Sequence, residues 1–230
     1  MPTEFTEHIY RQYEDELSHL KDRLLVMGGL AEERLRASVA AIVSRDSGLA
    51  EQVVHGDEPL NQLHKEIDDR SFKLLALRQP MAVDLRTILA AVKINTDLER
   101  VGDLAVNIAE AGLRYLLHPP VKELVDLPRM AEIAHEMLRH ALDAFVRRDV
   151  DLARSVCEQD DELDELKDRV FRDLLVLMLR NPAIVEPSLD LVLISRHLER
   201  TGDHATNIAE DVIFMVSARD VRHPAEPTRS

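Results

Sequence analysis

The sequence contains few of the residues that build disulfides, tight turns or aromatic cores. Its 230 residues include one cysteine, seven glycines and no tryptophan, and aromatic residues make up 3% of the chain. The lone cysteine, Cys157, cannot form an internal disulfide and suits a reducing compartment. A chain that is rich in Leu and Ala but poor in Gly is typical of helical bundles rather than β-sandwiches. We therefore expect an all-α fold.

Positive charge and long apolar runs are also scarce. Lys and Arg number 29 against 43 Asp and Glu, which gives a formal net charge of −14. This balance argues against a nucleic-acid partner and against adsorption to an anionic membrane surface. The longest apolar run, Leu174 to Leu179, is far shorter than the ~20 residues of a membrane-spanning helix, and the charged start lacks the apolar segment of a signal peptide. We expect a soluble, cytoplasmic protein without membrane insertion.

One helical segment occurs twice in the chain. Ile94 to Glu110 reads INTDLERVGDLAVNIAE, and Ile194 to Glu210 reads ISRHLERTGDHATNIAE. Eleven of the seventeen positions are identical at an offset of 100 residues. Amphipathicity alone does not require that much identity, so the repeat indicates two similar modules, each large enough to bury a core.

The spacing of apolar residues predicts the helices and their grouping. Two three-helix bundles in tandem, related by a pseudo-twofold axis, are the simplest architecture with this pattern. The first bundle would cover residues 1–120, the second 121–218, and residues 219–230 would form a disordered tail. The helices are expected at about 9–44, 49–77 and 83–117, then in a fourth segment ending near Asp149, and at 151–179 and 188–218.

Each copy of the repeated segment carries a row of oxygen-bearing side chains opposite its apolar stripe. A second acidic line lies on the preceding helix of the second module, and its first-module equivalent is partly amide. Oxygen ligands on neighbouring helices suit Mg, Mn or Ca, and bridging carboxylates suit iron or zinc. The candidate metal ligands are Glu99, Asp103, Asn107, Glu199, Asp203, Asn207, Asp57, Asn61, Asp160 and Asp164.

Other interpretations of these residues compete with a metal site. The acidic rows could be a solvated surface that holds scattered counterions, and the protein a metal-free dimeric scaffold. A di-metal carboxylate enzyme of the ferroxidase type is a further alternative, because Glu16-x-x-His19 and Glu132-x-x-His135 have the spacing of di-iron ligands. These two motifs are not equivalent under the repeat offset, which argues against a shared site.

At these residues the chain resembles the PhoU family of phosphate-transport accessory and regulatory proteins. The similarity covers nearly all of residues 10–218. Its marks are Leu74-Leu75-Ala76-Leu77, Gln79-Pro80-Met81-Ala82, Asp84-Leu85-Arg86 and the two segments that end in Asn-Ile-Ala-Glu.

The resemblance implies a function that the residue pattern alone does not. PhoU-like proteins are non-enzymatic negative regulators that act between the phosphate ABC transporter and its sensor histidine kinase. Many are homodimers of paired three-helix bundles, and some carry iron or zinc clusters on Glu/Asp-x-x-x-Asp motifs. Carried over, the motif falls on Glu99 with Asp103, Glu199 with Asp203, and Asp160 with Asp164. The remaining pair is Asp57 with Asn61, where the amide departs from the motif and predicts a weaker first cluster.

Overall fold

The protein is built from long α-helices, as a computed structural model shows for residues 4–219 and 221. Side chains are described from residue 11 onward. Most of the predicted tail, residues 220 and 222–230, lies outside the described residues. The helices are α1 (Glu4–Ser44), α2 (Ser47–His55), α3 (Glu58–Arg78), α4 (Val83–Leu116), α5 (Asp126–Arg147), α6 (Val150–Arg180) and α7 (Val185–Ser217), with a short 3₁₀ turn at Pro182–Ile184.

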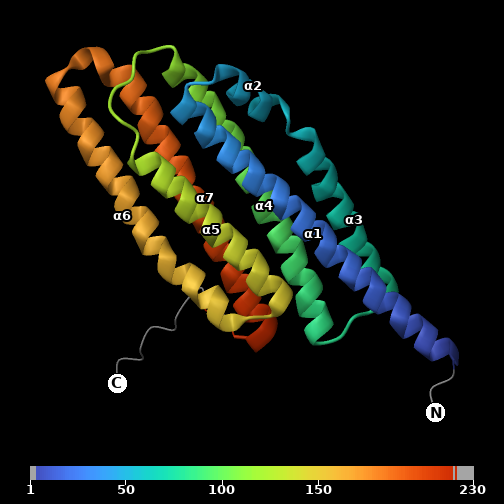
Figure 1. Ribbon diagram of the computed structural model, residues 1–230. Helices are drawn as coiled ribbons and strands as arrows, with labels where there is room; N and C mark the ends of the chain where they lie inside the picture. Colours follow the sequence, from blue (N-terminus) through green and yellow to red (C-terminus); the bar gives the residue numbers. More distant parts are fainter. Residues whose placement is uncertain (1–3, 220, 222–230) are drawn as a thin grey trace, which may run out of the picture.

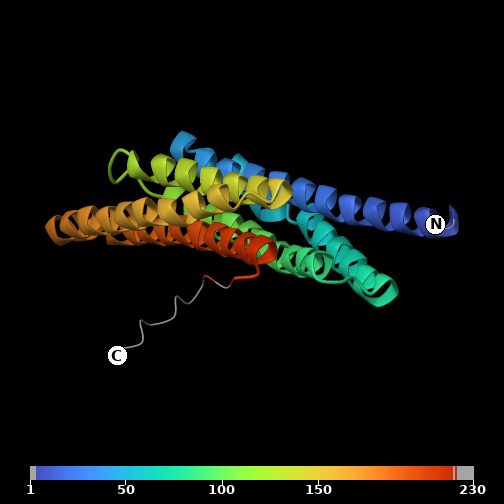
Figure 2. The same ribbon diagram turned by 90° about the horizontal axis from the view of Figure 1, so that it is seen from below.

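The helices form two three-helix bundles side by side, as the sequence predicted. Helices α1, α3 and α4 make the first bundle, and α5, α6 and α7 make the second (Figure 1). Helices α4 and α7 make the most extensive contact, and α1 packs against α5. Helices α4 and α7 are antiparallel, because Lys93 pairs with Asp211 at 2.8 Å while Arg114 pairs with Asp190 at 2.9 Å. The α3–α4 and α6–α7 turns therefore lie at opposite ends of an elongated molecule (Figure 2).

The two bundles share a continuous apolar core. Buried side chains of α1 and α4, such as Leu24 and Ile94, belong to the same cluster as Met137 and Ile194 of α5 and α7. Burial of apolar surface is the main favourable term in folding, so this core joins the halves as well as stabilising each one. None of the described helices is long and apolar enough to cross a membrane.

The predicted second helix, 49–77, is divided in the structure. It ends as α2 at His55 and restarts as α3 at Glu58, whereas the equivalent α6 runs unbroken from Val150 to Arg180. Gly56 is unfavourable within a helix, and Pro59 lies in the first turn of α3, where its missing N–H costs nothing. These two residues were the sequence signal for the break.

The two modules turn at the same place with the same residues. Arg45 and Arg148 both end their helices in the left-handed conformation, each with φ of 56°. The next residue, Asp46 or Asp149, accepts a hydrogen bond from a backbone N–H of the following helix and caps it. Arg45-Asp46 and Arg148-Asp149 are 103 residues apart in the sequence, so the two modules are structurally equivalent at that offset in this region.

Candidate functional site: two acidic clusters

The predicted acidic residues gather in two places, one in each bundle. The first cluster comprises Asp57, the N-cap residue of α3, and Asn61 of α3 with Glu99 and Asp103 of α4. The second cluster comprises Asp160 and Asp164 of α6 with Glu199 and Asp203 of α7. All eight side chains lie half-buried or exposed rather than within the apolar core, as the helical pattern predicted.

Close helix packing sets the geometry of both clusters. Gly102 and Gly202 face the helix that carries the partner carboxylates. A methyl group on Gly102 would lie 3.0 Å from Leu60 Cδ1, and one on Gly202 would lie 2.5 Å from Leu163 Cδ2. The same position on Gly202 is 3.2 Å from Asp160 Oδ1. The glycines therefore let α3 and α6 approach closely enough to place their acidic residues beside the repeated segment.

Arg34 of α1 extends its largely buried side chain into the first cluster. Arg34 Nη2 lies 3.1 Å from Asp57 Oδ1 and donates a hydrogen bond of 2.9 Å to the Val53 carbonyl. The Arg34 side chain is only 11% exposed. Burial lowers the pKa of Arg34, whereas the charges of Asp57 and Asp103 act to raise it. The guanidinium therefore sits between carboxylates of both α3 and α4.

The remaining groups of the first cluster also have partners. Asn61 Nδ2 donates to Asp57 Oδ2 at 2.6 Å. Arg100 lies 3.6 Å from Glu99 and 3.4 Å from Asp103. Arg100 is largely exposed, so water screens these two pairs and each contributes little. Three carboxylates thus face two arginines.

The second cluster has more carboxylates and fewer cations. Lys167 Nζ lies 2.9 Å from Asp164 and 3.0 Å from Glu199, and its hydrogen bond to Asp164 is the largest cause of its raised pKa. Lys167 of α6 therefore links Asp164 to Glu199 of α7. In the described part of the chain, no Lys or Arg forms an ion pair with Asp160 or Asp203.

The pKa of Asp160 reflects both its burial and the excess negative charge of the second cluster. Its pKa is raised to about 6, first by burial and then by the charges of Asp203, Asp164 and Glu199. Both causes disfavour the ionised carboxylate. The second cluster is therefore a place where a cation beside Asp160 would be electrostatically favourable, whereas in the first cluster Arg34 already pairs with the equivalent Asp57.

The fit of the predicted metal differs between the clusters. In the first, the Arg34 guanidinium stands where a cation would be held and an amide replaces one carboxylate, so the residues do not suit a metal ion. In the second, the four carboxylates are the oxygen donors that hard cations and carboxylate-bridged metals use. Among the side chains described, those of residues 11–219 and 221, however, no three His, Cys, Asp or Glu groups converge in a ready ligand set. Metal binding at the second cluster would require its side chains to rearrange.

The two asparagines of the predicted rows lie apart from the clusters. Asn107 is exposed, and Asn207 lies 3.5 Å from Asp97 Oδ1 on the opposite bundle. Asp97 also contacts His204 Nδ1 at 2.8 Å. Asn207 therefore belongs with His204 to the α4–α7 contact between bundles. The structure does not group Asn107 and Asn207 with the predicted acidic ligands.

The two Glu-x-x-His motifs also have separate surroundings. Glu16 pairs with Arg78 at 2.7 Å, whereas His135 lies 3.0 Å from Glu32 across the contact of α1 and α5. His19 is exposed. The facing pair of motifs that a di-iron bundle uses is therefore not formed by these residues.

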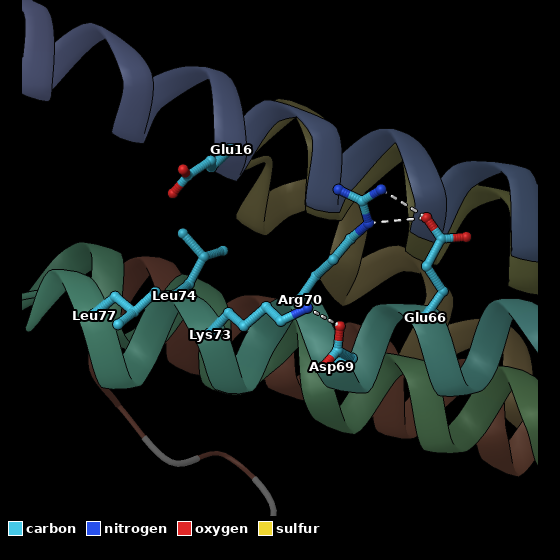
Figure 3. A pocket seen from close by; sticks show the side chains of 7 residues that line it. All are labelled: Glu16, Glu66, Asp69, Arg70, Lys73, Leu74 and Leu77. Atoms are coloured by element: carbon cyan, nitrogen blue, oxygen red, sulfur yellow. Dashed lines mark hydrogen bonds and ion pairs between the residues drawn. The ribbon is translucent and has the colours of Figure 1, made fainter.

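A hollow of about 350 Å³ lies between α1 and α3, away from both clusters. Figure 3 shows Arg70 turned toward Glu66 and Lys73 turned toward Asp69, with Leu74 and Leu77 beside them. Its cations are thus already paired with acidic residues of the same helix, while Leu77 is 75% exposed. The hollow is a mixed polar and apolar surface near the α3–α4 end.

Sequence reasoning missed the two cations that enter the clusters. The signal for Arg34 was present, because the 103-residue spacing that relates Arg45 to Arg148 aligns it with the apolar Met137. A charged residue that aligns with an apolar residue of the other module marks a position where the modules differ. Lys167 lies three residues after Asp164, a spacing that favours contact on a helix. The contact of Asp97 with His204 had no such signal, because it depends on how the bundles pack.

Comparison with known families identifies the repeat. The family model described as "PhoU domain" matches residues 24–112 and again residues 127–212. A curated relative from Caulobacter vibrioides, a phosphate-specific transport system accessory protein PhoU homolog, is 42% identical over 217 residues, which is 94% of each chain. A homolog of the same name from Pseudomonas aeruginosa is 39% identical over 95% of this chain and 90% of its own.

Solved structures show the same fold. The crystal structure of PhoU from Pseudomonas aeruginosa superimposes with a TM-score of 0.86 at 38% identity and covers 90% of this chain and 100% of that one. The phosphate transport system regulatory protein PhoU from Streptococcus pneumoniae has a TM-score of 0.85 at 27% identity, over 92% of this chain and 100% of its own. The agreement therefore extends over the paired bundles as a unit.

Proposed function

This chain belongs to the PhoU family, and from that premise we propose that it lowers phosphate uptake and represses the phosphate-starvation response. In this proposal it acts in the cytoplasm as a non-enzymatic adaptor between the ATPase of the phosphate ABC transporter and the phosphate-sensing histidine kinase. The match to phosphate-transport accessory proteins along nearly the whole chain supports the transport role.

The observation that best supports an adaptor is the pair of apolar ends. Leu77 and Met81 at the α3–α4 turn are 75% and 81% exposed, and Leu179 and Leu189 at the α6–α7 turn are 77% and 51% exposed. These turns lie at opposite ends of the molecule (Figure 1). Clustered exposed apolar residues are typical of protein–protein contacts. Duplication of the module has thus produced two separate surfaces of the same kind, which suits two simultaneous contacts.

An adaptor of this kind acts by binding one state of its partner more tightly than another. A ligand can shift a conformational equilibrium only by its difference in affinity for the two states. We propose that the α3–α4 end, with its adjacent hollow, contacts the transporter ATPase. The α6–α7 end would contact the kinase. We also propose that the chain works as a homodimer, as the family resemblance suggests.

A metal ion at the acidic residues is a further part of the proposal. Asp160, Asp164, Glu199 and Asp203 would hold an iron or zinc ion, or Mg, Mn or Ca. The bound cation would neutralise their repulsion and fix the distance between α6 and α7. Metal occupancy would therefore stabilise the second bundle and shape the surface near it.

Deletion of the gene in the native host tests the regulatory role. We expect higher phosphatase expression and higher phosphate uptake in phosphate-rich medium. The complemented strain is the control and should restore both values. Unchanged uptake together with unchanged phosphatase expression would refute the proposal.

Surface variants test which ends make the contacts. We expect Leu77→Lys with Met81→Lys to weaken binding to the purified transporter ATPase by more than tenfold, because apolar anchors dominate such interfaces. Leu117→Lys is the matched control, since Leu117 is 83% exposed but follows the C-terminus of α4, at the opposite end of the molecule from the α3–α4 turn. Equal binding by the double variant and the control would exclude the α3–α4 end as the contact.

A further inference from the structure

The two acidic clusters differ in the residue that the remaining long helix of each bundle, α1 or α5, places beside them. In the first bundle, α1 contributes Arg34 to the cluster. In the second bundle, the equivalent residue of α5 is Met137, which is fully buried. A methyl group on Gly202 would lie 3.5 Å from Met137 Cε and 3.2 Å from Asp160 Oδ1. The Met137 side chain therefore ends near Asp160. Asp160 is the second-bundle equivalent of Asp57, the carboxylate that Arg34 contacts.

The contacts of Arg34 are those of a built-in cation. Its guanidinium forms the 3.1 Å ion pair with Asp57 on α3 and a 2.9 Å hydrogen bond to the carbonyl of Val53 on α2. The side chain is 11% exposed and that of Asp57 is 26% exposed, so both charges have given up much of their hydration. A charge in this position is retained without large cost only when it is paired.

We propose that Arg34 takes the place of a metal ion in the first acidic cluster, so that this cluster is complete without metal. The guanidinium links α1 to the carbonyl of Val53 on α2 and to Asp57 at the start of α3, and its charge also attracts Asp103 of α4. The consequence rests on the metal-binding part of the proposed function: any metal that the chain takes up binds only at the second cluster. The break between α2 and α3 is part of the same device, because it exposes the Val53 carbonyl to Arg34.

The first test measures stability without metal. Arg34→Met copies Met137, and in the presence of EDTA we expect the thermal midpoint to fall by about 4–8 °C because Asp57 loses its partner. The matched control is Arg36→Met, which removes an exposed arginine from the same helix. Arg34→Lys keeps the charge but loses the planar guanidinium, so its midpoint should lie between those of Arg34→Met and Arg36→Met. This variant keeps the proposal testable if Arg34→Met does not fold. A midpoint of Arg34→Met equal to that of Arg36→Met would overturn the proposal.

The second test measures metal content. Chains equilibrated with Zn²⁺ alone, and separately with Mn²⁺ alone, are desalted and assayed by elemental analysis. In a chain with Asp160→Asn and Asp203→Asn, we expect retained metal to fall to background because Arg34 blocks the first cluster. Adding Arg34→Met and Asn61→Asp to that chain should restore about one equivalent, since four oxygen ligands then lack the buried guanidinium and only the largely exposed Arg100 remains beside them. If the chain with all four substitutions retained only background metal, the result would contradict the proposal.

A further outcome separates this inference from the proposed function. If the unmodified chain takes up neither Zn²⁺ nor Mn²⁺, the metal-binding part of the proposed function fails, yet the midpoint in EDTA still decides the role of Arg34. If the chain with Asp160→Asn and Asp203→Asn retains metal that Asp57→Asn then removes, the first cluster binds metal with Arg34 in place. That result overturns the inference while leaving metal binding intact.

Discussion

The first and second bundles follow one plan but balance their acidic residues differently. The first bundle divides its middle helix at Gly56 and places Arg34 among its carboxylates, whereas the second keeps α6 continuous and places Met137 at the equivalent position. Asp160 consequently has no cation in contact within the described chain, and its pKa is raised to about 6. The comparison shows that two copies of a duplicated module can keep the same backbone while differing in charge pairing. The first copy pairs its half-buried carboxylate with its own arginine, whereas the second leaves the equivalent carboxylate to be neutralised by an outside cation.

Truncation of the matched core leucines should give the largest effects and test whether the bundles are equivalent. Leu60 and Leu163 pack on Gly102 and Gly202 and are almost fully buried. We expect Leu60→Ala and Leu163→Ala each to lower the free energy of unfolding by about 2–5 kcal/mol, through lost burial and the cavity left behind. Urea unfolding measures both values. A cost below about 1 kcal/mol at one position alone would show that the modules are packed differently.

Neutralising one acid in each cluster should have opposite effects at neutral pH. Asp57→Asn removes the partner of Arg34 and should destabilise the protein by about 1–3 kcal/mol. Asp160→Asn removes a repelled carboxylate and should stabilise the metal-free protein by about 1 kcal/mol, a value reduced for partial exposure to water. The same sign for both substitutions in chelator-treated protein would remove the electrostatic distinction between the bundles.

The pH dependence of Asp160→Asn follows from the direction of its pKa shift. The folded pKa of about 6 lies above the ordinary value of 3.8, so ionisation of Asp160 opposes folding. The penalty is absent below about pH 4, grows between about pH 4 and 6, and is complete above about pH 6. Denaturant titrations across this range should show the stabilising effect of Asp160→Asn vanish at low pH. A pH-independent effect would exclude repulsion as its cause.

Alanine at the two matched glycines should distinguish how tightly the bundles are packed. At Gly202 the added methyl group would lie 2.5 Å from Leu163, and at Gly102 it would lie 3.0 Å from Leu60. Helix propensity favours alanine by up to about 1 kcal/mol, and overpacking opposes it. We expect Gly202→Ala to destabilise by about 1 kcal/mol and Gly102→Ala to be nearly neutral. Thermal unfolding of the two variants would refute this ranking if Gly102→Ala were the more damaging.

The smallest effect concerns the thiol of the second bundle. Burial raises the pKa of Cys157 to about 11, and the nearby charges of Glu210 and Asp160 add to the shift. At pH 8 we therefore expect the native thiol to react with a disulfide reagent on the order of a hundredfold more slowly than free cysteine. Unfolding in urea should remove the difference. Rapid labelling of the native protein would show that this region is less covered and less acidic than the structure indicates.

The features predictable from the sequence are those that depend on spacing along one helix. The repeated segment predicted the acidic rows and the paired bundles, because helical periodicity decides which side chains share a face. The division of the second helix at Gly56 was missed, although Gly56 and Pro59 are both in the sequence. Periodicity of the flanking apolar residues continues across the break and masks it.

The parts of the site that could not be predicted depend on contacts between helices. Arg34 meets Asp57 only because α1 packs beside the end of α2, and Lys167 chooses Glu199 because α6 lies against α7. The same holds for Asn207, whose position on α7 directs it toward Asp97 rather than the second cluster. Residue types and spacing identified the acidic groups, but tertiary packing decided which cation each one meets.

A double-mutant cycle on Arg34 and Asp57, beside the matched cycle on Met137 and Asp160, tests the central distinction most directly. Unfolding free energies in EDTA for Arg34→Met, Asp57→Asn and their combination give the coupling between the first pair. Met137→Leu and Asp160→Asn give the corresponding value for the second pair. We predict a favourable coupling of about 1–3 kcal/mol for Arg34 with Asp57 and a value near zero for Met137 with Asp160. Equal couplings, or none for Arg34 with Asp57, would contradict a built-in cation in the first bundle.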